Sequence, residues 1–277
     1  MKSSYLRFFF VFGLLFSSQI ASAQTYRVLL TNDDGIESPL LATLRQELAV
    51  IPNVEVVVVA PNENKSGSSQ STSPSPLTVE RSYRDGAFFG YAVFGTPADS
   101  VRFGVIELGK IDPFDLVVSG INLGANVGDV SHSSGTVGAA MEALNLGVPA
   151  IAVSQEVRDV NTVASARFAA QVVRRYQEQG APEDVLVSIN VPGGALLGIA
   201  VRPMADSYLQ TAAFSLVEQT GERFTYESER VIVQSTDTSS DTYAYQQGYV
   251  TVTPLKFDWS AIDFIDDVES WELRLTN

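Results

Sequence analysis

Residues 26–39, "YRVLLTNDDGIESP", place an apolar run, an acidic pair and a helix start in direct succession. The first five residues predict a buried strand, and Ser38 and Pro39 supply an N-cap and a first-turn proline for a helix of about a dozen residues. Asp33 and Asp34 lie between these two elements, at the carboxyl end of the strand. An isolated Asn-Asp-Asp-Gly is often only a surface turn, whereas adjacent carboxylates at a strand end also suit a metal ion. The rest of the chain has to decide between these two interpretations.

Strands and helices alternate along the first 200 residues. The further strands are predicted at 54–59, 115–119, 149–154 and 184–192, and the further helices at 96–109, 135–147 and 160–179. Strands that alternate with helices indicate parallel strands joined by right-handed crossovers. We therefore predict a doubly wound α/β fold, with a mostly parallel sheet between two helical layers.

After about residue 200 the pattern changes. The segments "RFTYESERVIVQ" (223–234) and "AYQQGYVTVTPL" (244–255) alternate apolar and polar residues and contain aromatic residues, which predicts antiparallel strands. The polar stretch "STDTSSD" (235–241) separates them. We expect a β-hairpin arm over about 224–255, which either serves assembly or covers its own subunit.

The N-terminus has the pattern of a secretory signal peptide. Lys2 and Arg7 precede the apolar run "FFFVFGLLF" (8–16), and "ASA" (21–23) is a small-x-small cleavage site. The apolar run is far shorter than the roughly 20 residues that span a bilayer. We expect cleavage before Gln24 and export, most simply to a bacterial periplasm, with no membrane association afterwards.

Without residues 1–23, the mature chain has 254 residues, which fit one domain over 24–277. Its core is expected over about 24–200, followed by the arm and a C-terminal segment over about 201–277. Removal of Lys2 and Arg7 with residues 1–23 changes the net charge from −14 to −16. Such an acidic surface excludes a general DNA or RNA binder. The chain has no cysteine, so that no disulfide supports the core. A small phosphorylated substrate remains possible where a cation or a helix terminus offsets the charge.

Polar residues follow three of the predicted strands. The acidic pair follows the first strand, "APNENKSGSSQS" (60–71) the second, and "GINLGANVGD" (120–129) the third, which continues into "SSGTVGAA" (133–140). In an open parallel sheet these strand ends meet in one crevice. The side chains are carboxylates, hydroxyls and amides, which suit Mg²⁺, Mn²⁺ or Ca²⁺. The helix start in the last segment offers an anion site, and a cation beside it is typical of phosphate-ester hydrolysis.

At these residues the sequence resembles the SurE family, the survival-protein nucleotidases. The resemblance rests on "LLTNDDG" (29–35), "VVAPNENKSG" (58–67), "FGTPADSV" (94–101), "DLVVSGINLGANVGD" (115–129), "SGTVGAAMEA" (134–143), "INVP" (189–192) and "GYVTVTPL" (248–255). It implies a Rossmann-like core, a C-terminal hairpin used in dimer or tetramer assembly, and metal-dependent release of phosphate from nucleoside 5′- and 3′-monophosphates. Some members also act on short polyphosphate.

Carried over by motif position, the resemblance implies one Mg²⁺ or Mn²⁺ ion per subunit, with Ca²⁺ as a substitute in crystals. The metal ligands would be Asp33, Asp34, Ser66 and Asn122. The two aspartates would also be the catalytic residues, one binding the metal directly and the other acting through water or as a base. The expected substrate contacts are Asn32, Gly67, Gly120, Asn126, Ser134, Gly135 and Thr136.

Other polar residues near these motifs have simpler interpretations. Gly95, Thr96 and Asp99 are explained by a helix start. His132 is the only histidine, and it is interpreted as a loop residue rather than a general acid. With one histidine no Ser-His-Asp triad is expected, whereas an aspartyl-phosphate at the acidic pair remains open.

The chain departs from the family in two segments. It has Tyr243 where the family often has histidine in Asp-x-His-Ala, and residues 206–230 fit the family poorly. Substrate preference and assembly therefore stay open. The leading hypothesis is an exported, metal-dependent phosphomonoesterase that acts on nucleoside monophosphates and assembles as a homodimer or tetramer. The alternatives are a broad acid phosphatase or exopolyphosphatase, and a non-catalytic nucleotide- or phosphate-binding protein.

Overall fold

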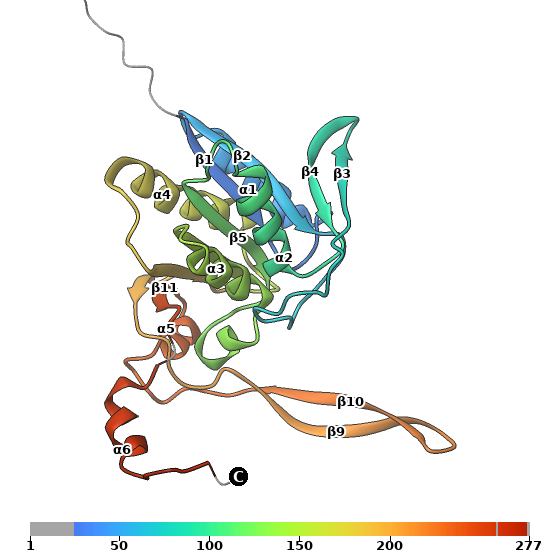
Figure 1. The fold of residues 1–277 in the computed structure, drawn as a ribbon, viewed down its shortest axis with the longest axis vertical. Coiled ribbons are helices and arrows are strands. Elements are labelled where there is room, and N and C mark those ends of the chain that lie inside the picture. The colour runs from blue at the N-terminus through green and yellow to red at the C-terminus, as the bar shows by residue number, and fades with distance from the viewer. Residues whose placement is uncertain (1–24, 259, 276–277) are drawn as a thin grey trace, which may run out of the picture.

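The computed structural model describes residues 25–258 and 260–275, and its centre is a nine-stranded, mostly parallel sheet (Figure 1). The strand order is β3-β4-β2-β1-β5-β6-β7-β11-β8. The strands of this sheet are β1 (Tyr26–Thr31), β2 (Val54–Pro61), β3 (Val79–Arg84), β4 (Ala87–Val93), β5 (Leu116–Leu123), β6 (Ala150–Gln155), β7 (Val185–Val191), β8 (Gly198–Val201) and β11 (Tyr249–Lys256). The signal peptide predicted over 1–23 lies outside the described residues.

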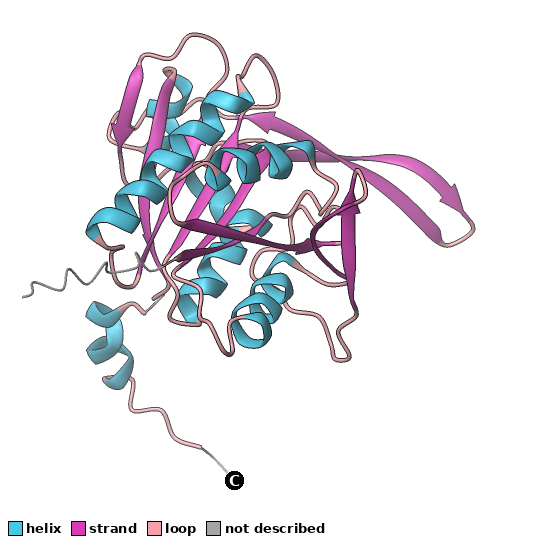
Figure 2. Ribbon diagram, turned by 90° about the horizontal axis from the view of Figure 1, so that it is seen from above, coloured by secondary structure: helices cyan, strands magenta, loops and turns pink. Residues whose placement is uncertain are grey.

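Helices cover both faces of the sheet (Figure 2). They are α1 (Pro39–Ala49), α2 (Pro97–Arg102), α3 (Gly135–Asn145) and α4 (Thr162–Gln179). Alternate residues of β1 belong to different layers: Val28 and Leu30 share a buried cluster with α1 and α4, whereas Leu29 packs with α2 and α3. This arrangement confirms the predicted α/β class with three layers.

Two elements differ from the sequence-based expectation. The strand predicted at 115–119 continues to Leu123, so that Gly120 and Asn122 belong to β5 and not to a loop. The helix predicted over 96–109 is regular only to Arg102 and continues as a π-helical turn over Phe103–Leu108. A capping box between Thr96 and Asp99 begins it, in agreement with their interpretation as a helix start.

The hairpin predicted over 224–255 is wrong in its second strand. The arm is formed by β9 (Leu209–Thr220) and β10 (Arg223–Ile232), which pair antiparallel and project from the body (Figure 1). The polar segment 235–241 leads instead into α5 (Asp241–Gln246), and β11 then enters the central sheet between β7 and β8. Alternation identifies a strand but does not identify its partner, and the two predicted strands pair with different neighbours.

The root of the arm is fastened to the body. Val233 N donates to Tyr208 O (2.9 Å), which closes the base of the hairpin. The buried carboxylate of Asp241 accepts hydrogen bonds from the backbone N–H groups of Gly128 and Ala205, each at 3.1 Å. The point at which the arm leaves the core is thereby held against the loop that follows β5.

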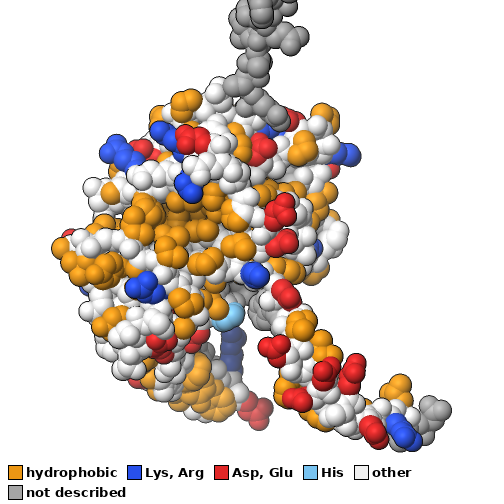
Figure 3. Space-filling view, turned by 90° about the vertical axis from the view of Figure 1, so that its left-hand side faces the viewer, with side chains coloured by type: hydrophobic (Ala, Val, Ile, Leu, Met, Phe, Trp, Pro, Cys, Tyr) orange, Lys and Arg blue, Asp and Glu red, His pale blue; other side chains and the backbone are white. Residues whose placement is uncertain are grey.

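Exposed hydrophobic side chains occur on the body and on the C-terminal tail, among other places. Hydrophobic side chains form a band across the face in Figure 3, and the exposed residues of the β8 region are Leu196, Leu197, Ile199 and Val201. The C-terminal tail with α6 (Ile265–Glu269), at the lower right of Figure 3, carries both acidic and apolar side chains. Within the part of the chain described, no helix is long and apolar enough to cross a membrane.

Candidate functional site

The acidic pair lies at the carboxyl edge of the sheet, where the strand order reverses. From β1 the chain passes to β2 on one side, and β5 lies on the other side of β1. Such a switch point leaves a crevice beyond the strand ends in open α/β sheets. Asp33 and Asp34 approach it from β1, and Asn122 approaches it from β5.

Asp33 is enclosed by the N-terminus of α3. Its side chain is 2% exposed, and Thr136 Oγ1 donates to Asp33 Oδ1 at 2.5 Å. Gly135 permits this approach, since a Cβ atom there would lie 2.8 Å from Asp33 Cβ. Burial raises the pKa of Asp33 to about 6, the charge of Asp34 adds to this effect, and the Thr136 hydrogen bond opposes it.

Asp34 connects two other loops. Its carboxylate accepts hydrogen bonds from Leu123 N (3.0 Å) and from Asn64 Nδ2 (3.2 Å). Asn64 Oδ1 in turn accepts from Ser66 N (3.0 Å), which fixes the serine loop beside the acidic pair. Burial raises the pKa of Asp34 as well. Two neighbouring carboxylates therefore both lie where their charged forms are disfavoured.

The predicted donors surround one cavity of about 500 Å³. Asp33, Ser66 and Asn122 all line it, which brings three of the four expected metal ligands to one place. Asn122 Nδ2 donates to Gly124 O (2.7 Å), an interaction that orients the amide. Asp34 is held at the edge of this cavity through Leu123, which lines it.

The expected phosphate cradle is partly assembled in the same cavity. Gly67, Asn126 and Ser134 line it, and Ser134 caps α3 by accepting from Val137 N (3.1 Å). Asn126 is held rigidly, because its Nδ2 donates to Ser154 Oγ (2.8 Å). The N-terminus of α3 therefore faces the cavity with the dipole direction that favours an anion.

Four of the expected substrate contacts do not line the cavity. Asn32 is fully buried, and its Oδ1 atom has no hydrogen-bond partner within residues 25–258 and 260–275. Gly135 and Thr136 contact Asp33 rather than lining the cavity. Gly120 is buried within β5, where a Cβ atom would lie 2.4 Å from Val153 O. These residues therefore pack around Asp33 and the strand ends instead of facing the cavity.

His132 belongs to a different hollow. It lines a cavity of about 550 Å³ together with Met141, Met204 and Lys256, on the other side of the serine loop. Its backbone oxygen accepts from Ser69 Oγ at 2.8 Å. His132 is the last residue of a 3-10 helix, Gly128–His132, and does not line the cavity of the acidic pair.

Sequence reasoning missed the outer wall of the cavity. The roots of β9 and β10 supply Leu209, Thr211 and Arg230, and the loop after β5 supplies Asp129 and Val130. The arm was predicted with a different strand pairing, which gave no reason to bring 209–211 to the acidic pair. The poor family fit of 206–230 was the one signal that this wall is particular to the chain.

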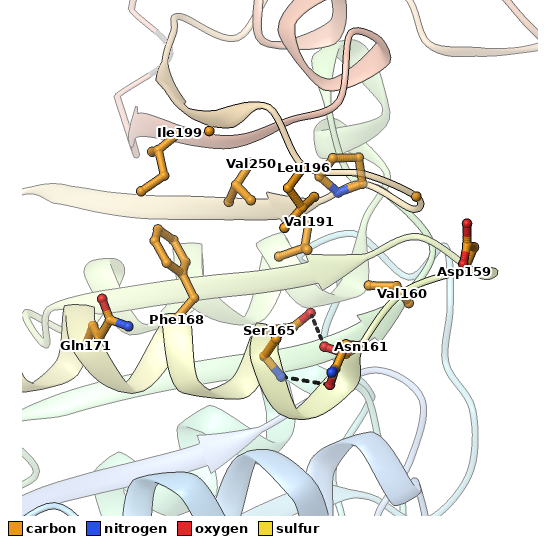
Figure 4. A pocket seen from close by; sticks show the side chains of 14 residues that line it. Asp159, Val160, Asn161, Ser165, Phe168, Gln171, Val191, Leu196, Ile199 and Val250 are labelled. Carbon is orange, nitrogen blue, oxygen red and sulfur yellow. Dashed lines mark hydrogen bonds between the residues drawn. The ribbon is translucent and has the colours of Figure 1, made fainter.

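Cavity volume alone does not distinguish the candidate site from the other pockets. An apolar pocket of about 390 Å³ lies between α4 and β8, lined by Phe168, Leu196, Ile199 and Val250 among others (Figure 4). Of the described residues that line it, Asp159 at its rim is the only one with a carboxylate. The 500 Å³ cavity is distinguished by its paired carboxylates, its amide oxygens and its helix N-terminus.

The chain is similar to proteins of known family over most of its length. A family model described as survival protein SurE matches residues 28–241. A protein named 5′-nucleotidase SurE from Syntrophobacter fumaroxidans is 34% identical over 252 residues, which cover 89% of this chain and 100% of the relative. A protein of the same name from Syntrophus aciditrophicus is 37% identical over 251 residues, covering 88% and 93%. The crystal structure of the SurE protein from Aquifex aeolicus superposes with a TM-score of 0.73 at 31% identity, covering 89% of this chain and 100% of that chain.

Proposed function

Because the chain belongs to the SurE family, we propose that it is a phosphomonoesterase that hydrolyses nucleoside 5′- and 3′-monophosphates to nucleoside and phosphate. The printed name of its relatives, 5′-nucleotidase, supports a nucleotide as substrate. The main structural support is the acidic pair at the end of β1, with Asp33 against the start of α3 and Asp34 against the loops of Ser66 and Leu123.

The proposed activity depends on one divalent cation, Mg²⁺ or Mn²⁺, held by Asp33, Asp34, Ser66 and Asn122. Among the described residues no cluster of three or more His, Cys, Asp or Glu side chains could hold a metal, so that neutral oxygens have to complete the set. Two carboxylates with neutral oxygen donors suit these hard cations. A cation would also offset the crowding of two carboxylates whose pKa values burial raises. When bound, it would supply positive charge to a phosphate oxygen and acidify water.

Residues of the chain would also bind the phosphate and accept the proton. The N-terminus of α3, capped by Ser134, would bind phosphate oxygens through backbone N–H groups. Asn126 would hold a further oxygen through an orientation fixed by Ser154. Either carboxylate of the acidic pair would accept a proton from the attacking water.

One assay tests this function: phosphate release from AMP by the mature protein with Mg²⁺ or Mn²⁺, and again with EDTA. We expect turnover that EDTA abolishes and fresh metal restores. The same assay with 3′-AMP, p-nitrophenyl phosphate and polyphosphate separates the alternatives. Equal rates on all of them would indicate a broad phosphatase, and AMP binding without phosphate release would indicate a binding protein.

We further propose that residues 1–23 direct export and are then removed. The support is the charged, apolar and small-residue succession of the N-terminus. N-terminal sequencing of protein from a periplasmic extract should begin at Gln24. A cytoplasmic protein that retains Met1 would contradict this proposal.

Assembly as a homodimer or tetramer is also proposed, through the arm of β9 and β10. Both strands expose large apolar side chains, among them Phe214, Leu216, Phe224 and Tyr226. An isolated two-stranded hairpin is only marginally stable in water, so that an arm of this length benefits from a partner surface.

A further inference from the structure

The arm brings two polar side chains to the wall of the candidate site. Arg230 of β10 and Thr211 of β9 are cross-strand partners near the root of the hairpin. Both line the 500 Å³ cavity that Asp33, Ser66 and Asn122 also line. The arm is therefore part of this cavity as well as a projection from the body.

Arg230 is the only positively charged residue among the described residues that line this cavity. The other charged lining residues are Asp33 and Asp129, and Asp34 lies beside them. A phosphate dianion would approach this wall in a protein whose net charge is −14. Unlike charges within a few ångströms attract and like charges repel, so one cation here has a large influence on anion binding.

Among the described residues, the guanidinium of Arg230 has no hydrogen-bond or ion-pair partner. The residue is exposed. By contrast, Arg102 pairs with Glu142 at 2.6 Å and Arg167 pairs with Glu47 at 3.3 Å. All five donors of Arg230 are therefore available to a ligand.

The arm root is also attached to the cavity loop. Ser207 Oγ donates to Asp129 Oδ2 (2.6 Å), and Asp129 N donates to Asp206 O (3.0 Å). Ser235 Oγ closes the other side of the root by donating to Asp206 Oδ2 (2.6 Å). Asp206 and Ser207 lie just before the strand that carries Thr211, and Ser235 follows the strand that carries Arg230, so both ends of the arm root are attached to the cavity loop.

We propose that Arg230 is a substrate-binding residue whose guanidinium binds the phosphate dianion, with the Thr211 hydroxyl beside it. The guanidinium fork matches phosphate oxygens bidentately and keeps its charge at every physiological pH. Leu209, Leu123 and Val130 provide apolar wall for the remainder of the substrate. This assignment rests on the proposed phosphomonoesterase function and adds a residue from the arm to it.

The test compares Arg230→Met with Arg223→Met in the mature protein. Arg223 lies on the same strand, faces Thr220 across the hairpin and is far from the cavity, so both variants remove one charge from the same arm. We expect Arg230→Met to lower kcat/KM for AMP about tenfold, mainly through KM, and Arg223→Met to stay within about twofold. Arg230→Lys should recover part of the loss.

Binding of inorganic phosphate, measured by calorimetry, separates the two proposals because it needs no turnover. Arg230→Met should weaken phosphate binding about as much as it raises KM for AMP. If the wild type binds phosphate through Arg230 but does not hydrolyse AMP, the proposed function fails, and Arg230 is then the phosphate-binding residue of a non-catalytic site. If the wild type hydrolyses AMP and both variants match it, the inference is overturned. It is also overturned if KM for AMP rises while phosphate binding is unchanged, or if Arg223→Met has the same effect.

Discussion

Two adjacent aspartates have very different surroundings in the candidate site. Asp33 is enclosed, faces the start of α3 and is bonded to Thr136, whereas Asp34 is only partly buried and bonded to Leu123 and Asn64. Neighbouring side chains of an extended chain point in different directions, and here the two carboxylates hold different loops. They thus draw together all the segments from which the metal ligands are expected.

Replacement of either carboxylate by its amide tests the metal site. Asp34→Asn keeps the size of the side chain but removes charge that would hold a divalent cation, so phosphate release should fall by several orders of magnitude. Circular dichroism should stay unchanged, and titration with Mn²⁺ should show weakened binding. Asp85→Asn, in an exposed turn, is the matched control and should match wild type. Near-normal activity of both Asp33→Asn and Asp34→Asn in EDTA would show that the pair is only a turn.

Asp33 also predicts how the metal-free protein responds to pH. Its folded pKa of about 6 lies above the ordinary value of 3.8, so the folded state binds the proton more tightly than the unfolded state. Stability therefore falls as the pH rises from about 4 to about 6, by up to about 3 kcal/mol. In EDTA, Asp33→Asn should melt several degrees above wild type at pH 7.5, and this advantage should disappear near pH 4. A difference that is independent of pH, or a lower melting temperature of Asp33→Asn at pH 7.5, would contradict this assignment.

At the scale of elements, the site depends on how closely the serine loop packs on α3. Gly138 lies on α3 beside this loop, and a Cβ atom there would lie 2.0 Å from Ser69 O. Gly138→Ala should therefore displace the loop that carries Ser66, lower the melting temperature and raise KM. Asn145→Ala, near the end of the same helix, is the control, because it adds no volume near the loop. Thermal unfolding and steady-state kinetics measure both effects, and an unchanged KM would show that the loop does not need this contact.

The central strands of the sheet could be predicted from the sequence, and the strands towards its two ends could not. Continuous apolar runs such as 54–59 identify parallel strands, because such strands are covered on both faces. The strands β3 and β4 were missed, since β3 has no buried residue and β4 is buried only in part, without the continuous burial of a central strand. The strand β11 was recognised but assigned to the arm, because its antiparallel pairing with β7 requires a return that no local signal encodes.

The site could be predicted where strand ends and motifs coincide. Asp33, Ser66 and Asn122 follow the rule that ligands gather at the carboxyl edge, and the structure places them around one cavity. Arg230 could not be predicted, because its place depends on which strands pair at the arm root. The arm root is held by contacts such as those of Asp241 with Gly128 and Ala205, which no local sequence pattern indicates.

At the scale of the whole molecule, the arm predicts assembly. Light scattering of the mature protein at micromolar concentration should give at least twice the mass of a monomer of about 27 kDa. Leu216 and Tyr226 face each other across the arm and are exposed. Leu216→Asp should shift the protein towards monomer, because it places a charge on the proposed contact.

The control for assembly is Thr225→Asp, which adds the same charge at a polar position of the arm. It should keep the mass of the wild type. A monomeric wild type would contradict the role of the arm in assembly, and the arm would then serve only its own subunit.

The place of β11 in the sheet also determines when β8 can pair during synthesis of the chain. β8 pairs only with β11 in the central sheet, yet β11 is made much later and lies close to the C-terminus. A nascent chain therefore carries β8 unpaired until nearly all of its residues have emerged. Under the proposed export this delay is an advantage, because a chain whose sheet is still open can pass unfolded through a translocation channel.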